Sequence, residues 1–155
     1  MRFKAPHFPK TSVLLADPNP FTLKLIRDLC REAGIRHMYE VMAPADLPTA
    51  VAAYAIDVYV LDQRVLQDPA SNAWGILQAR TGADGVAPAL ALYGLPRQSD
   101  IMRARQYGIY CALSKPFAPR DFWVRLGWLA QRAEPSPALA AVEETMAEAE
   151  AALVG

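Results

Sequence analysis

The chain has 155 residues, of which 53% are hydrophobic and 21% charged, and its 16 basic residues equal its 16 acidic residues in number. These values are typical of one compact domain with a short appendage, and no apolar run reaches the roughly 20 residues of a membrane span. No apolar segment follows the basic start as in a secretory signal, so we expect a cytoplasmic protein. The charge balance gives no reason to expect nucleic acid as a partner.

Apolar, β-rich runs alternate with amphipathic segments along the chain. They predict strands at residues 12–16, 37–42, 57–61, 87–93 and 110–114. They predict helices at residues 20–33, 47–55, 72–80, 99–107 and 119–132. This order predicts an α/β fold with a doubly wound sheet of five parallel strands and right-handed crossovers.

The ends of two predicted helices carry recognisable capping residues. Asn19 precedes the first helix as a cap, and Gly34 ends it. Ser99 is the expected cap of the helix at 99–107. The apolar face of the first helix is broad and includes Phe21 and Leu25, which we expect to face the core.

The last part of the chain differs in charge from the rest. Residues 1–133 hold all 16 basic residues and 11 of the acidic ones, whereas residues 134–155 hold five glutamates and no basic residue. We predict a domain at 11–133, a Pro-rich linker at 134–137 and an acidic amphipathic C-terminal helix at 138–155. A short isolated helix is marginal in water, so this helix is expected to pack on the body or on a second chain, or else to fray. A purely solvated helix remains an alternative.

The cysteines and histidines give no sign of a metal centre. Cys30 and Cys111 fall in apolar helix and strand patterns, which favours reduced, buried thiols. His7 and His37 lie apart in the sequence without paired cysteines nearby, so a zinc site has no support.

Three charged residues follow buried strands. Asp17, Asp62 and Lys115 each stand at the end of a predicted strand. The carboxyl ends of parallel strands open into one crevice, so the two carboxylates and the ammonium are expected to converge there. Taken alone, each aspartate is also compatible with a turn or a helix cap.

This order and spacing resemble the receiver domain of two-component response regulators, from about Thr11 to Arg132. The resemblance implies a flavodoxin-like fold and a signalling module that is not an enzyme. It implies that Asp62 is the phospho-acceptor position and that Lys115 is the family's lysine. It also implies an acidic pocket of Asp17 and Asp62 that holds Mg²⁺.

Several positions depart from the family pattern. Pro18 replaces a second acidic residue, so we expect Mg²⁺ binding to be weak if it occurs at all. Tyr93 stands where the family has Ser or Thr, and Ala112 stands where it has an aromatic switch residue. The two changes are complementary, since Tyr93 can fill the space left at Ala112. Arg64 lies within reach of either aspartate and can substitute for the missing metal charge.

The segment after Asp62 is longer than in the family. Residues 67–71 are interpreted as an insertion of about five residues, in a loop beside the site. Such loops more often form binding surface than defects.

Three functions are compatible with these residues. The first is an atypical single-domain response regulator that acts by protein–protein contact and is phosphorylated weakly or not at all. The second is a conventional phosphorelay receiver, phosphorylated at Asp62 by a histidine kinase. The third is a small-ligand sensor for a dinucleotide, which would use four arginines near the face formed by the helices at 99–107 and 119–132: Arg97, Arg103, Arg105 and Arg120. A homodimer through that face or through the C-terminal helix is also expected, and neither nucleic acid nor membrane is.

Overall fold

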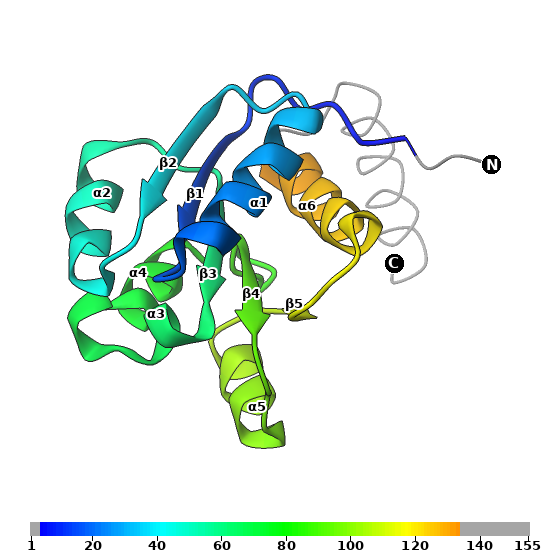
Figure 1. Ribbon diagram of the computed structural model, residues 1–155. Coiled ribbons are helices and arrows are strands. Elements are labelled where there is room, and N and C mark those ends of the chain that lie inside the picture. Colours follow the sequence, from blue (N-terminus) through cyan, green and yellow to red (C-terminus); the bar gives the residue numbers. More distant parts are fainter. Residues whose placement is uncertain (1–3, 134–155) are drawn as a thin grey trace, which may run out of the picture.

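The computed structural model describes residues 4–133, which form one sheet with helices on both faces (Figure 1). The sheet has five parallel strands in the order β2-β1-β3-β4-β5. The strands are β1 (Ser12–Ala16), β2 (His37–Val41), β3 (Val58–Asp62), β4 (Ala89–Tyr93) and β5 (Cys111–Ser114). The predicted fold class is confirmed.

The helices divide between the two faces of the sheet. They are α1 (Pro20–Glu32), α2 (Leu47–Ala53), α3 (Gln63–Gln67), α4 (Ala73–Arg80), α5 (Gln98–Gln106) and α6 (Pro119–Ala133), with short 3₁₀ turns at Pro44–Asp46 and Pro69–Ser71. Helices α1 and α6 cover one face, and α2 to α5 cover the other.

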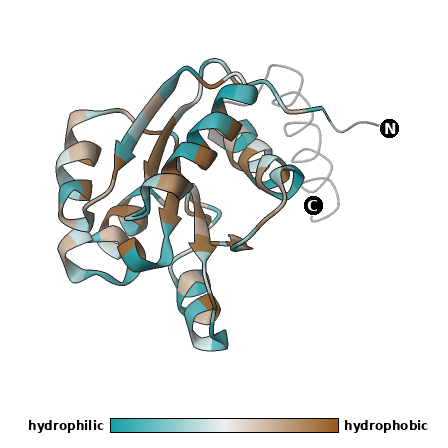
Figure 2. Cartoon of the chain, in the orientation of Figure 1, coloured by the Kyte–Doolittle hydropathy of each residue, from teal (hydrophilic) through white to brown (hydrophobic). Residues whose placement is uncertain are grey.

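Strand residues alternate between two hydrophobic clusters, as the two-residue period of a strand requires. In β3, Val58 and Val60 pack with α1 and α6, whereas Tyr59 and Leu61 pack with the helices on the other face. All five residues of β3 are buried. Figure 2 shows the strands as mostly hydrophobic and the helices as mixed in hydropathy, which fits a sheet covered on both faces.

The broad apolar face predicted for the first helix is wrong at two positions. Phe21 and Leu25 are 83% and 48% exposed. The buried stripe consists of Leu23, Ile26, Leu29 and Cys30. The sheet and α6 cover only this narrower stripe of α1.

Two further local predictions are wrong. Ser99 lies inside α5, whose cap is Arg97, and the carboxylate of Asp100 accepts a hydrogen bond from the Arg97 backbone N–H at 3.0 Å. The segment after Asp62 is not a plain loop, because it folds into α3 and a 3₁₀ turn. The predicted cap Asn19 does accept a hydrogen bond from the Phe21 backbone N–H at 2.9 Å.

Both cysteine thiols are free and buried, as the sequence predicted. Burial raises the pKa of Cys30 to about 12. The predicted linker at 134–137 and helix at 138–155 lie outside the described residues. Within residues 4–133, every helix is too short or too polar to cross a membrane.

Candidate functional site

The three charged residues at the strand ends form one cluster. Asp17 follows β1, Asp62 ends β3 and Lys115 follows β5. The ammonium of Lys115 lies 2.6 Å from Oδ2 of Asp17 and 2.5 Å from Oδ1 of Asp62. Both carboxylates are buried. The structure therefore brings together the residues that the sequence placed in one crevice.

Arg64 joins this cluster from α3. Its Nε donates to Oδ2 of Asp62 at 3.0 Å, and its Nη2 donates to Oδ1 of Asp17 at 3.2 Å. The side chain of Arg64 is 57% exposed, so the guanidinium covers the carboxylates from the solvent side. Two cations thus bridge the same two anions.

Helix α3 holds Arg64 at this place. Asp62 is the N-cap of α3, and its Oδ2 accepts a hydrogen bond from the Arg64 backbone N–H at 2.8 Å. Val65 and Leu66 are buried in the core, which fixes the rotation of this short helix. Ser71, in the 3₁₀ turn that follows, donates its hydroxyl to the backbone carbonyls of Val65 and Asp68, which both precede that turn.

Every carboxylate oxygen of the two aspartates already accepts a hydrogen bond. Oδ1 of Asp17 accepts from the Asn19 backbone N–H at 2.8 Å and from Arg64, and Oδ2 accepts from Lys115. Oδ1 of Asp62 accepts from Lys115, and Oδ2 accepts from Arg64. Among residues 4–133, no three His, Cys, Asp or Glu side chains converge as metal ligands. Mg²⁺ requires several free oxygen ligands, so the residues as arranged do not fit it.

The cations also set the protonation of Asp62. Burial by itself raises the pKa of its carboxyl, but the hydrogen bonds from Lys115 and Arg64 outweigh burial and hold the pKa below its ordinary value of 3.8. Asp62 is therefore ionised at neutral pH.

A lowered pKa in the folded state predicts how stability depends on pH. Asp62 contributes stability above its unfolded pKa, and this contribution is lost as the pH falls through the folded value. We expect Asp62→Asn to lower the free energy of unfolding by about 2–3 kcal/mol at pH 7. This is less than the roughly 3–5 kcal/mol of a fully broken buried pair, because Asp17 remains as a partner of both cations. The difference in unfolding free energy between Asp62→Asn and the wild type should shrink at pH 3 and below. Urea unfolding at pH 7 and pH 3 measures this difference. An equal difference at the two pH values would contradict a lowered pKa of Asp62 in the folded state.

Comparison with known proteins finds no matching family model and no matching curated protein. Solved structures do match. The receiver domain of the Francisella response regulator 1452 is 20% identical with a TM-score of 0.64, over 81% of this chain and all of that one. This chain has the receiver-domain fold of response regulators.

Two other receiver-containing structures agree. Full-length FixJ from B. japonicum is 20% identical with a TM-score of 0.70, over 92% of this chain and 66% of that one. The receiver domain of Ssk1 from Saccharomyces cerevisiae, solved with the histidine phosphotransfer protein Ypd1, is 18% identical with a TM-score of 0.63, over 84% and 96% of the two chains.

On this receiver fold, Tyr93 lies in the hydrophobic cluster on the face of the sheet that α2 to α5 cover. It ends β4 opposite Ser114, and Ala112 lies two residues earlier on the same face of β5. Tyr93 is 2% exposed and borders a hollow of about 30 Å³ between α3, α4 and α5. Burial, and next the negative charge of Asp100, raise the pKa of its hydroxyl.

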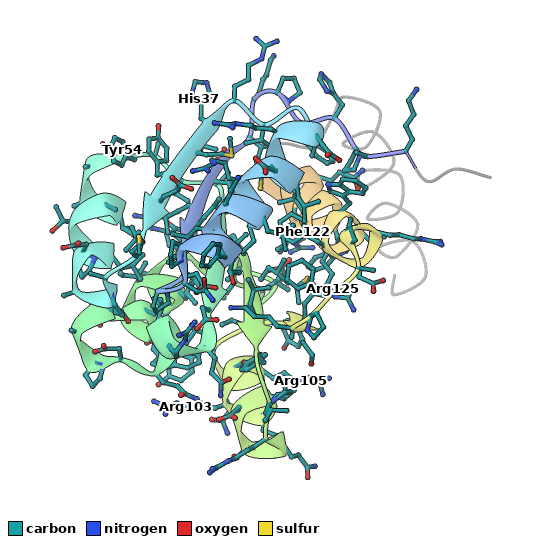
Figure 3. The ribbon with its side chains drawn as sticks, viewed as in Figure 1. His37, Tyr54, Arg103, Arg105, Phe122 and Arg125 are labelled. Carbon is teal, nitrogen blue, oxygen red and sulfur yellow. The ribbon has the colours of Figure 1, made fainter. Side chains whose placement is uncertain are left out.

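The predicted grouping of four arginines is wrong for one of them. Arg103 lies over the ring of Trp74 in α4, with its guanidinium carbon 5.0 Å from the ring centroid. Figure 3 shows Arg103 and Arg105 on opposite sides of α5, with Arg105 on the side of Arg125. Arg103 and Arg105 therefore do not lie together on one side of α5.

The sequence prediction missed three polar residues near the site. Gln63 and Gln67 of α3 both donate to the carboxylate of Asp100. The acidic residue in the first turn of α5 is a signal that could have found Asp100. No sequence signal distinguishes the two glutamines from ordinary surface residues.

Proposed function

We propose that this chain is an atypical response-regulator receiver that signals by protein–protein contact and is phosphorylated weakly or not at all. The observation that carries the proposal is the closed cluster of Asp17, Asp62, Lys115 and Arg64, in which all four carboxylate oxygens have cationic or backbone N–H donors. The fold supports a role in two-component signalling.

The charge of the cluster argues against ordinary phosphoryl chemistry. Phosphoryl transfer to a carboxylate is helped by a divalent cation that gathers the phosphoryl oxygens. Arg64 and Lys115 already neutralise the two aspartates, and Pro18 adds no carboxylate. Two like charges about 4 Å apart repel by about 4 kcal/mol at an effective dielectric near 20, so a metal would have to displace Arg64.

The position of Tyr93 argues in the same direction. Its phenol is buried in the hydrophobic cluster under α3, α4 and α5, where it borders the same hollow as Leu66 and Trp74. We infer that Tyr93 packs as a fixed core residue and does not bind a phosphoryl oxygen. A signal in this protein is then carried by the state of the charged cluster and by the partner that reads it.

The partner we propose is a protein. The Ssk1 receiver, which this chain resembles, was solved in complex with a histidine phosphotransfer protein. A histidine kinase, a phosphotransfer protein or a downstream target are the classes of partner that such a fold serves. A homodimer through α5 and α6 belongs to the same proposal.

The test is a titration of the wild-type protein followed by NMR at Asp62, Arg64 and Lys115. We expect Mg²⁺ to bind only in the range of about 10 mM or weaker, and beryllofluoride, a phosphoryl mimic, to leave these signals unchanged. A Mg²⁺ dissociation constant below about 1 mM with beryllofluoride binding would instead show a conventional phosphorelay receiver. Binding of a cyclic dinucleotide with shifts at Arg97 and Arg105 would favour the ligand-sensor alternative.

A further inference from the structure

The carboxylate of Asp62 has a second role besides its ion pairs. Its Oδ2 caps α3 by accepting from the Arg64 backbone N–H, while its Oδ1 is bonded to Lys115. An N-cap satisfies a backbone donor at the start of a helix that otherwise lacks a partner within it. Any change at Asp62 therefore acts directly on the first turn of α3.

Two glutamines of α3 contact the start of α5. Gln63 and Gln67 are four residues apart and share one helix face. The Nε2 of Gln63 donates to Oδ2 of Asp100 at 3.3 Å, and the Nε2 of Gln67 donates to Oδ1 at 3.4 Å. Oδ2 of Asp100 also accepts from the backbone N–H of Arg97, the N-cap of α5. One carboxylate thus both caps α5 and anchors α3.

Helix α5 has little other packing to hold it. Of its nine residues, all of them described, Ala104 alone is buried. Figure 1 shows α5 extending away from the sheet. Besides Ala104, Ile101 packs against the core at its edge, and Arg103 lies over Trp74, whose ring is 4.7 Å from that of Tyr107. A helix with few buried apolar contacts belongs to the less stable parts of a fold, so α5 is sensitive to the loss of one anchor.

We propose that α3 couples the charged cluster to α5 through two helix caps in series, from Asp62 to α3 and from Asp100 to α5. Loss of charge at Asp62, or displacement of Arg64 from it, weakens the hold on α3. The two glutamines of α3 then release Asp100, and the locally opened state of α5 becomes more populated. Neither Tyr93 nor Ala112 takes part in this route. The inference rests on the proposed function in that it makes the cluster the origin of the signal.

The experiment is amide hydrogen exchange on the full chain without metal. Arg64→Ala removes the side-chain contacts of α3 with both aspartates and keeps the backbone cap. We expect it to speed exchange at residues 101–105 of α5 about fivefold, because α3 loses its side-chain contacts with both aspartates and holds Asp100 less firmly. The double variant Gln63→Ala/Gln67→Ala should give a similar increase. Adding Arg64→Ala to that double variant should then speed exchange in α5 no further, because the hydrogen bonds between α3 and Asp100 are already absent.

Arg36→Ala is the matched control, since it removes one arginine at the opposite end of the sheet, just before β2. This variant should leave the exchange rates of residues 101–105 unchanged. The coupling is refuted if Arg64→Ala does not affect residues 101–105, or if it acts equally in the presence and absence of Gln63 and Gln67. An equal increase in β1 and α1 would also refute it, because that pattern reports global destabilisation. Tight Mg²⁺ binding by the wild type would overturn the proposed function alone, since the exchange is measured without metal.

Discussion

The double variant Pro18→Asp/Arg64→Ala should bind Mg²⁺ at least about a hundredfold more tightly than the wild type. Pro18→Asp supplies a second carboxylate next to Asp17, and Arg64→Ala removes one donor from Oδ1 of Asp17 and one from Oδ2 of Asp62. A nearby charge contributes up to about 4 kcal/mol at an effective dielectric near 20, and the exposure of Arg64 reduces this. If each change contributes about 1.4 kcal/mol to Mg²⁺ binding, each raises the affinity tenfold. Isothermal titration calorimetry measures the affinity.

Pro18→Asp alone and Arg64→Ala alone should each raise the Mg²⁺ affinity about tenfold. The two single variants therefore measure separately the effect of the missing carboxylate and the effect of the guanidinium that occupies the site. Arg36→Ala again serves as the control, because it makes the same change in net charge away from the cluster. If Arg64→Ala binds Mg²⁺ no more tightly than the wild type, Arg64 does not occupy the place of the metal. Pro18 alone would then account for the weak binding.

Replacing Tyr93 by threonine should lower the free energy of unfolding by about 2–4 kcal/mol, because it leaves a cavity in a packed core. Tyr93 is 2% exposed and packs in the same hydrophobic cluster as Ala112. If the two side chains share one space, Tyr93→Thr/Ala112→Tyr should recover much of the loss. Urea unfolding of the wild type, both single variants and the double variant completes the cycle.

Tyr110→Thr provides the control for this cycle. Tyr110 precedes β5 and is 59% exposed, so its replacement should cost less than about 0.5 kcal/mol. Additive effects in the Tyr93 and Ala112 cycle, without recovery, would show that the two positions do not share a space. Tyr93 would then be an isolated core residue.

The alternation of strands and helices was readable from the sequence because it depends on local patterns. Continuous apolar runs mark strands that are buried on both faces, and the predicted strand at residues 57–61 is observed as Val58–Asp62. The meeting of Asp17, Asp62 and Lys115 followed from the same patterns. Parallel strands end at one edge of the sheet, whatever the details of their packing.

The tertiary structure decided how Arg64 joins that cluster and which residues leave the core. The sequence placed Arg64 within reach of either aspartate, but it reaches both because Asp62 caps α3 and buried Leu66 fixes the rotation of that helix, which is too short to show a periodicity. Phe21 is exposed because the sheet and α6 cover only part of the apolar face of α1. Arg103 turns toward Trp74 because the ring face attracts its guanidinium. A strand pattern sets which edge of the sheet a residue occupies, whereas contacts between distant segments set the direction of each side chain there.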